Sequence, residues 1–259
     1  MLLENRVAIV SGIGPGMGRD ISLAFAREGA DLVIAARTRE KVDAVAKEVE
    51  ALGRRCIPLP ADITKDADCA ALAQAAVGEF GRIDVLVNNA FHGGNFRTFE
   101  DSEVDAYLTP FKVNTLGSLR LTKAVLPTMK AQQSGSVVMI NSMVVREVNP
   151  GQSTYGASKG ALLLATQGIA RELGPYGIRV NSVLPGYIWG PNVQIGFKME
   201  AARRGITEQQ AYDEVAAQIP LGKIPDSEEI AGAVVFFASD LSRVITGQTL
   251  DVNGGHYMA

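Results

Sequence analysis

A tyrosine and a lysine stand four positions apart in the stretch Tyr155-Gly-Ala-Ser-Lys159. Residues four apart share a helix face, so the phenol and the ammonium are expected to point the same way. An ammonium near a phenol lowers the phenol pKa from its ordinary value of about 10, which would let Tyr155 act as a general acid and base. The same spacing is common in surface pairs, so it does not establish a catalytic role by itself.

Two further polar groups stand where strand-like runs end. Ser142 follows the apolar run 137–141, and Asn88 closes the apolar run 83–88. In an open parallel sheet the ligand binds at the carboxyl ends of the strands. We therefore expect both groups to lie at the ligand-binding edge of one sheet.

A glycine-rich turn, Ser11-Gly-Ile-Gly-Pro-Gly-Met-Gly18, follows the first strand-like run and opens a helical pattern. Glycine lets the backbone turn tightly and approach a pyrophosphate, and the helix start offers unpaired N–H groups to an anion. Because the turn lies between a strand and a helix, it indicates dinucleotide binding. Tight packing without a ligand is the alternative explanation.

The end of the second strand-like run is where an acidic residue would bind the 2′-hydroxyl of NAD. The sequence there reads Ala35-Ala-Arg37-Thr-Arg39, without an acid. The planar guanidinium of Arg37 suits a 2′-phosphate, so we expect a preference for NADP(H), with NAD(H) as a possible second cofactor. The alternatives are that Arg37 stacks on the adenine or points into solvent.

Short apolar runs alternate with helical patterns along the chain. The expected strands are 6–11, 32–36, 56–60, 83–88, 137–141, 179–184 and 249–252. The expected helices include 17–28, 38–52, 65–80 and one that runs from Tyr155 to about 173, which Ser153 or Thr154 is placed to cap. This alternation predicts an α/β fold, a single Rossmann-like, doubly wound parallel sheet of about seven strands with helices on both faces, in one domain over residues 1–259.

Residues 190–222 form the one long stretch without a strand. They hold two amphipathic patterns, one with Val193 and Phe197 and one with Tyr212, Val215 and Ile219. Apolar residues at such spacing predict helices. We therefore expect a flap of two helices that covers the substrate.

The overall composition narrows the class of protein. The chain has 259 residues, 47% of them hydrophobic, and a formal net charge of -3. No basic cluster suggests nucleic acid as a partner. Cys56, Cys69, His92 and His256 lack metal-ligand spacing, so no metal is expected, and free thiols suit a reducing compartment. With no apolar run of about 18 residues and no signal-like start, we expect a cytoplasmic protein without a membrane partner.

Together these motifs make the chain resemble the short-chain dehydrogenase/reductase family over essentially its whole length. The matching residues are Gly12…Gly16-Met17-Gly18, Asp62, Asn88-Asn89-Ala90, Asn114, Ser142, Tyr155…Lys159, Pro185-Gly186 and Thr246-Gly247-Gln248…Gly254-Gly255. Several spaced motifs in the family's order are far more specific than any one of them. The resemblance implies an oxidoreductase that interconverts an alcohol and a carbonyl with NAD(P)(H).

The resemblance also implies catalytic roles. Tyr155 would exchange a proton with the substrate oxygen, Ser142 would hydrogen-bond that oxygen, and Lys159 would lower the tyrosine pKa and hold the nicotinamide ribose. Asn114 would anchor a water that links Lys159 to solvent, unless it only braces a helix bend. Ser142 could alternatively be a plain strand-end residue. A homotetramer packed through the helices near 110–131 and 153–173 is the implied assembly.

The cofactor contacts that the resemblance implies, together with the Arg37 prediction, form one set. They are Gly12, Gly14, Gly16, Met17, Gly18, Arg37, Asp62, Ile63, Asn88, Ala90, Tyr155, Lys159, Pro185, Gly186 and Ile188. Asp62 would contact the adenine, although it could serve only as a helix cap before Thr64.

The side chains expected to face the substrate are mostly apolar or aromatic. They are Phe91, Ser142, Met143, Val144, Asn149, Gln152, Tyr155, Tyr187 and Trp189, with Phe197 and Met199 of the flap. No arginine stands among them to clamp a carboxylate. The hypothesis is a small-molecule substrate that is a hydrophobic ketone or secondary alcohol, for example a cyclic or steroid-like one.

The sequence departs from the family in two places. Phe91 stands where the family usually has glycine, so we expect the local loop geometry to differ from the family's, and the adjacent His92 is interpreted as a loop residue without a chemical role. The Gly14-Pro15 pair resembles a loop of enoyl reductases in the same superfamily. Those enzymes space tyrosine and lysine seven apart, so we reject that interpretation.

Two other classes of function remain as alternatives. One is a non-catalytic sensor or scaffold that binds a nicotinamide nucleotide, and the other is a cofactor-free dehalogenase of related fold. The presence of Ser142, Tyr155, Lys159 and Asn114 together argues against the first. The intact glycine-rich turn argues against the second.

Overall fold

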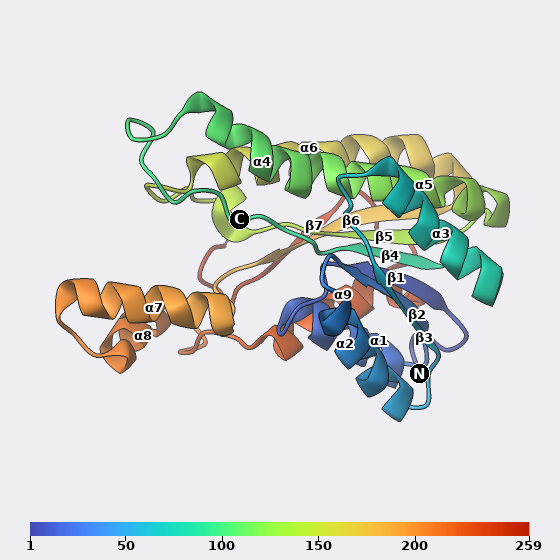
Figure 1. Ribbon diagram of the computed structural model, residues 1–259, viewed down its shortest axis with the longest axis horizontal. Coiled ribbons are helices and arrows are strands. Elements are labelled where there is room, and N and C mark those ends of the chain that lie inside the picture. The colour runs from blue at the N-terminus through green and yellow to red at the C-terminus, as the bar shows by residue number, and fades with distance from the viewer. Residues whose placement is uncertain (259) are drawn as a thin grey trace.

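The computed structural model describes residues 1–258 and contains a seven-stranded sheet in which all paired strands are parallel (Figure 1). The strands are β1 (Val7–Ser11), β2 (Asp31–Ala36), β3 (Cys56–Pro60), β4 (Val85–Asn88), β5 (Gly135–Ile140), β6 (Ile178–Pro185) and β7 (Thr249–Val252). Their order is β3-β2-β1-β4-β5-β6-β7, so the winding reverses between β1 and β4. Ligands bind such sheets at the carboxyl ends of the strands beside that reversal.

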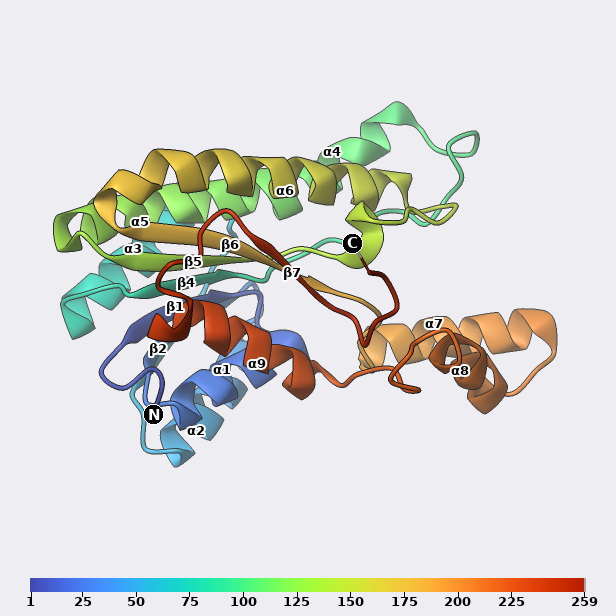
Figure 2. The same cartoon turned by 180° about the vertical axis from the view of Figure 1, so that it is seen from behind.

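Helices cover both faces of the sheet (Figures 1 and 2). One face carries α1 (Met17–Arg27), α2 (Arg39–Ala51) and α9 (Ser227–Ala238). The other face carries α3 (Asp66–Phe80), α5 (Ser118–Gln132) and α6 (Ser153–Leu173). A short α4 (Leu108–Pro110) and a π-helical turn (Phe111–Gly117) lead into α5, while α7 (Pro191–Arg204) and α8 (Glu208–Ala216) project beyond the sheet.

Alternate side chains of the central strands enter two separate apolar cores. In β1, Ala8 and Val10 pack toward α1, α2 and α9, whereas Val7 and Ile9 pack toward α3, α5 and α6. A strand buried on both faces must be apolar at nearly every position, and this requirement explains the continuous apolar runs of the sequence. The doubly wound α/β fold expected from the sequence is confirmed.

The flap, residues 190–222, has a small apolar core of its own. Phe197 and Ile219 are buried there, and Val193, Tyr212 and Val215 pack against them half-buried. These are the residues of the two amphipathic patterns, so both predicted helices are present. A capping box formed by the side chains and backbone of Thr207 and Gln210 starts α8.

The structure corrects two details of the sequence prediction. Helix α6 begins at Ser153, and no side chain in the described chain caps it, so the expected cap by Ser153 or Thr154 is wrong. The physical reason is that the helix starts before Tyr155, which places both residues in its first turn, where Ser153 accepts a hydrogen bond from the Tyr107 hydroxyl at 3.0 Å. The fourth and fifth strands also begin about two residues from their predicted starts.

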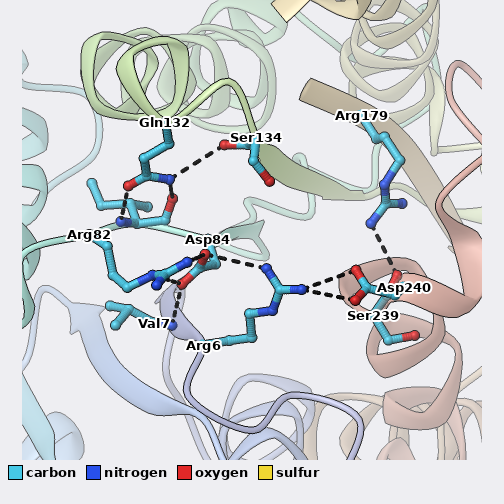
Figure 3. A network of polar contacts seen from close by, with 10 residues as sticks. Arg6, Val7, Arg82, Asp84, Gln132, Ser134, Arg179, Ser239 and Asp240 are labelled. Carbon is cyan, nitrogen blue, oxygen red and sulfur yellow. Dashed lines mark hydrogen bonds and ion pairs between the residues drawn. The ribbon is translucent and has the colours of Figure 1, made fainter. Parts of the chain in front are cut away.

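At the amino-terminal edge of the sheet, Asp84 collects polar contacts around the start of β1 (Figure 3). Its carboxylate accepts a hydrogen bond from the backbone N–H of Val7 at 2.9 Å and two from the Arg82 guanidinium at 2.8 and 2.7 Å. Arg6 lies 3.5 Å away and also binds Asp240. Because the Asp84 side chain is only 2% exposed, these partners replace water as its hydrogen-bond donors.

Replacing Asp84 with alanine should lower the free energy of unfolding by about 2 to 3 kcal/mol, because a buried N–H and two guanidinium groups lose their acceptor. Urea denaturation measures this loss. Asp240→Ala is the control, since its side chain is 76% exposed and an exposed pair contributes about 1 kcal/mol at most. Equal losses in the two variants would contradict the anchoring role of Asp84.

Candidate active site

Ser142, Tyr155 and Lys159 meet in one cavity at the carboxyl edge of the sheet. The cavity has a volume of about 280 Å³, and Pro185 and Gly186 at the end of β6 also line it. Ser142 follows β5, while Tyr155 and Lys159 lie one turn apart at the start of α6. The Ser142 hydroxyl is within hydrogen-bonding reach of the Tyr155 phenol. The structure therefore brings together three residues that are separated by 17 positions in the sequence.

Lys159 is only 2% exposed, which is unusual for a lysine. Its Nζ donates a hydrogen bond to the backbone carbonyl of Ile140 at 2.7 Å and lies 5.8 Å from the centre of the Tyr155 ring. Burial lowers the pKa of Lys159 to about 7, because an ammonium is poorly solvated there. The lysine can therefore gain or lose a proton close to neutral pH.

The electrostatics of Tyr155 differ from the sequence-based expectation. Burial raises the pKa of Tyr155 to about 12, although the hydrogen bond with Ser142 acts in the opposite direction. In this arrangement of side chains the hydrogen bond with Ser142 is the interaction that lowers the Tyr155 pKa, and the same effect expected of Lys159 stays a prediction. Burial disfavours the ammonium of Lys159 itself, and its Nζ is directed to the Ile140 carbonyl, so little positive charge favours the phenolate.

Asn114 lies in the π-helical turn before α5 and is completely buried. Its Oδ1 accepts a hydrogen bond from the backbone N–H of His92 at 2.7 Å, and its Nδ2 donates to the His92 carbonyl at 2.9 Å and to the Ser158 hydroxyl at 2.8 Å. The amide thus joins the loop after β4 to α6, next to Lys159. Such π-helical turns are rare and occur frequently at functional sites.

A second, larger cavity of about 740 Å³ extends from the glycine-rich turn to the ends of β2 and β3. Among the residues expected to contact the cofactor, those lining it are Gly12, Gly14, Gly16, Met17, Gly18, Arg37, Asp62, Ile63 and Ala90. Pro185, Gly186 and Ile188 line the smaller cavity. Because the two cavities share Gly16, Met17, Asn89, Phe91 and Pro191, they form one cleft along the edge of the sheet.

The backbone of the glycine-rich turn is shaped to receive an anion. Gly12 has a φ of 84°, and a Cβ there would lie 2.4 Å from the Cα of Ala90, so only glycine lets the ends of β1 and β4 come this close. Gly14 and Gly16 face open space. No side chain within the described residues caps the start of α1, which leaves its first N–H groups available to a pyrophosphate. These residues fit the dinucleotide that the motifs imply.

Two adjacent asparagines at the end of β4 point in different directions. The side chain of Asn88 enters the core, where its Nδ2 donates to Thr122 Oγ1 at 3.0 Å and to Met139 Sδ at 3.3 Å. Asn89 lines both cavities and donates from Nδ2 to the carbonyl of Gly12 at 2.8 Å. Sequence reasoning chose Asn88 as the cofactor contact and missed Asn89, because the motif does not show which asparagine leaves the sheet plane toward the cleft.

The far end of the larger cavity carries Arg37, Lys41 and Asp62. Hydrogen bonds from the backbone N–H and the hydroxyl of Thr64 hold the pKa of Asp62 below its usual range, so its carboxylate shapes the turn after β3. Sequence reasoning missed Lys41. The position of Lys41 in the first turn of α2 could have indicated it. A cation there opposes the helix dipole, and a bound anion would offset that cost.

The residues expected to face the substrate divide into two groups. Phe91 lines both cavities, and Ser142 and Tyr155 line the smaller one. Tyr187 and Trp189 instead pack against Phe197 of the flap, with ring centres 6.3 and 5.7 Å apart. The aromatic pair thus connects the end of β6 to α7.

The other members of that set are not among the lining residues of these two cavities: they are Met143, Val144, Asn149, Gln152 and Met199. Val144 is buried against Gly156, and Met143 lies beside Gly186. The backbone carbonyl of Asn149 accepts a hydrogen bond from the N–H of Gln152, while Met199 is 69% exposed. Apolar residues after β5 serve packing here as readily as ligand contact.

Several known proteins are similar to this chain. A family model described as enoyl-(acyl carrier protein) reductase matches residues 12–257. The 3-oxoacyl-[acyl-carrier-protein] reductase FabG of Thermotoga maritima is 34% identical over 257 residues, which cover 98% of this chain and 99% of that protein. An NAD⁺-bound xylitol dehydrogenase has a TM-score of 0.92 at 28% identity, covering 98% of this chain and 100% of that one. A 7α-hydroxysteroid dehydrogenase, complexed with NADH and 7-oxo glycochenodeoxycholic acid, has a TM-score of 0.87 at 29% identity, covering 98% and 94%.

The chain belongs to the short-chain dehydrogenase/reductase family. It is an oxidoreductase that acts on CH–OH or carbonyl groups with NAD(P). The family resemblance and the enzyme class inferred from the motifs are both confirmed. The sensor and dehalogenase alternatives are therefore set aside.

The remaining features of the described residues concern metal ligands, membrane-spanning helices and free thiols. Within residues 1–258, no group of three or more His, Cys, Asp or Glu side chains could hold a metal ion. In the same range no helix is long and apolar enough to cross a bilayer. Cys56 and Cys69 are free thiols, and burial raises their pKa to about 12 and about 11. Neither is activated as a nucleophile, because the thiolate is the reactive form.

Lys159→Met should change how stability depends on pH in the cofactor-free protein. The lysine pKa is about 7 in the folded chain and 10.5 in the unfolded one. Between these values the unfolded state binds more protons, so the lysine makes stability rise with pH by up to about 1.4 kcal/mol per unit. Below the folded pKa the folded state carries the full cost of a buried ammonium. The variant lacks this contribution, so its advantage over the parent should be larger at about pH 6 than at about pH 9.

Urea denaturation at both pH values measures this difference. Lys123→Met is the control, because Lys123 is exposed on α5. A difference between Lys159→Met and the parent that stays constant with pH would contradict a buried ammonium at this site.

Proposed function

We propose that the protein interconverts ketones and secondary alcohols at the Ser142–Tyr155 pair, with NADP(H) as its preferred cofactor. The observation that carries this proposal is the convergence of Ser142, Tyr155 and Lys159 on a cavity that continues into a dinucleotide-sized cleft. The 3-oxoacyl reductase and the 7-oxo ligand of the steroid enzyme support chemistry at a ketone. Enoyl reduction is disfavoured, because Tyr155 and Lys159 stand four apart.

The bound cofactor supplies or accepts the hydride. Tyr155 transfers a proton to or from the substrate oxygen, and Ser142 donates a hydrogen bond to that oxygen. Ser142 is suited to this role because its Oγ accepts a hydrogen bond from the N–H of Val144 at 3.3 Å, while its hydroxyl lies beside the Tyr155 phenol in the same cavity. Lys159 would hold the ribose hydroxyls and pass the proton onward, since its pKa of about 7 allows exchange near neutral pH.

Asn114 acts by position in this proposal. Its amide is occupied by His92 and Ser158, so it keeps the loop after β4 and helix α6 in register beside Lys159. A water relay at this turn would then use backbone groups of the π-helical turn. Asn114 would therefore serve both roles that the sequence left open. Its side chain acts as a brace, and the backbone of its turn would hold the relay water.

The substrate is proposed to be hydrophobic and without a carboxylate at its reacting end. The walls of the smaller cavity include Phe91, Ile140, Ile188 and Val193, and no arginine occurs among its described lining residues. Val193 and Pro191 belong to α7, which supports the proposal that residues 190–222 cover the substrate. The cleft draws on segments from Gly12 to Ser227, in keeping with one cofactor-binding domain over residues 1–259.

A turnover screen tests the reaction and the substrate class. Hydrophobic cyclic ketones and steroid-like ketones should be reduced with NADPH at least about tenfold faster than small charged oxo acids, because no arginine lines the smaller cavity to pair a carboxylate and Phe91, Ile140 and Ile188 give it apolar walls. Tyr155→Phe should lose at least about a hundredfold in turnover on the same panel while its affinity for NADPH stays within about twofold. Activity confined to small charged acids, or full activity of the variant, would overturn the proposal.

The preference for NADP(H) is proposed from the charges at the end of β2. Arg37 and Lys41 line the cavity there, and together they can pair a 2′-phosphate. The xylitol and hydroxysteroid dehydrogenases hold NAD⁺ and NADH, so the preference rests on residues of this chain.

The double variant Arg37→Ala, Lys41→Ala should weaken NADPH binding by about tenfold or more, since a hydrogen bond to a charged group contributes about 1.5 to 3 kcal/mol. NADH affinity should change by less than about threefold. Arg39→Ala is the matched control, because Arg39 is exposed and pairs with Asp43 on α2. Cofactor fluorescence titration measures the affinities of the parent, the double variant and the control for NADPH and NADH. Tighter binding of NADH than NADPH by the parent would refute the preference.

Self-association is proposed through α4, the π-helical turn and α6. Leu108, Phe111 and Leu164 are 49%, 38% and 69% exposed there, so these elements offer apolar side chains to a second copy. A homotetramer remains the proposed assembly. The cytoplasmic location expected from the sequence remains a prediction.

A further inference from the structure

Ser142 stands at the head of a single 3-10 turn, Met143–Val145. Its Oγ accepts the hydrogen bond from Val144, and its carbonyl accepts another from the N–H of Val145 at 3.2 Å. The N–H of Arg146 closes the turn on the carbonyl of Met143 at 2.7 Å. The direction of the Ser142 hydroxyl therefore depends on how this one turn is held.

The far end of the turn is fixed to β7 by an ion pair. Arg146 donates from Nε to Oδ1 of Asp251 at 3.2 Å and from Nη2 to Oδ2 at 3.0 Å. The two side chains are 31% and 18% exposed. A two-bond pair between a guanidinium and a carboxylate restricts orientation as well as distance. Asp251 itself is held in the sheet, where it pairs in register with Leu184 of β6.

The segment after β7 holds the next residue of the same loop. Glu147 lies against the Tyr257 hydroxyl, and Tyr257 is fixed by the hydrogen bond from Asn253 Nδ2 to its carbonyl at 3.0 Å. The ring of His256 stacks between Tyr257 and Tyr187, with centres 4.7 and 5.9 Å away. The loop that begins at Ser142 is thus held from one side by β7 and the residues that follow it.

We propose that Asp251 is a positioning residue for the reaction, which holds the Ser142 turn through Arg146 and so keeps the serine hydroxyl aligned with Tyr155. This inference rests on the proposed role of Ser142. Asp251 is not among the lining residues of either cavity. Its effect is therefore on the reaction step and not on cofactor binding.

The test is a double-mutant cycle on the full-length protein, using the best ketone from the turnover screen. Asp251→Asn should lower kcat about tenfold, because a small displacement of a catalytic group costs rate. KM and the Kd for NADPH should stay within about twofold. Arg146→Gln removes the other partner of the pair, which is the more exposed of the two, and should give the same loss. This variant keeps the test valid if Asp251→Asn folds poorly. Asp240→Asn is the matched control, since it removes a two-bond pair with Arg6 at the opposite edge of the sheet.

The decisive comparison is made in a Ser142→Ala background. If Asp251 acts through Ser142, adding Asp251→Asn to Ser142→Ala should change kcat by less than about twofold. Multiplied losses in the double variant, or wild-type kcat in Asp251→Asn and Arg146→Gln, would overturn the inference while leaving the function of Ser142 intact. Full activity of Ser142→Ala alone would instead reject the proposed function on which the inference rests.

Discussion

The burial of a parallel sheet on both faces is the constraint on which the rest of this structure depends. Parallel neighbours cannot be joined by tight hairpins, so each strand is followed by a crossover that returns over one face. All strands therefore release the chain at the same edge. The glycine-rich turn, Arg37, Asp62, Asn89 and Ser142 arrive there from five different strands. The site is a consequence of the winding.

The two edges of the sheet are energetically different. At the amino-terminal edge, Asp84 has donors on several sides, so a buried charge is well compensated. At the carboxyl edge, Lys159 is buried with the Ile140 carbonyl as the one acceptor its Nζ reaches in the described chain. A group that is poorly compensated in this way has a displaced pKa, which is the property that proton transfer requires. Stability and chemistry thus occupy opposite ends of the same strands.

Three residues that are proposed to act in the site lie where regular structure is interrupted. Asn114 is in a π-helical turn, Ser142 begins a 3-10 turn, and Gly12 adopts a left-handed backbone conformation. Each interruption frees backbone groups that a regular helix or strand would keep hydrogen-bonded, or turns a side chain away from the direction that the regular element would give it. Such segments need support from elsewhere, and here the support comes from distant parts of the chain. The His92 loop braces Asn114, and β7 braces the turn that follows Ser142.

The sequence by itself determined the fold and most of the residues that line the proposed cofactor cleft. A central strand that is buried on both faces must be apolar along its length, so such strands can be predicted from the sequence. The helical period likewise predicts that Tyr155 and Lys159 share one helix face. The tight turn at Gly12 is also predictable, because no other residue allows the close approach to Ala90.

Only the tertiary structure decided the direction of the Tyr155 pKa, the outward turn of Asn89 and the packing of Tyr187 and Trp189 into the flap. A pKa depends on the solvation and the charges around a group, and an aromatic ring suits a core as well as a ligand. The same holds for Arg146 and Asp251, which are 105 positions apart. Their pairing follows from the docking of β7 beside β6, which no local pattern in the sequence records.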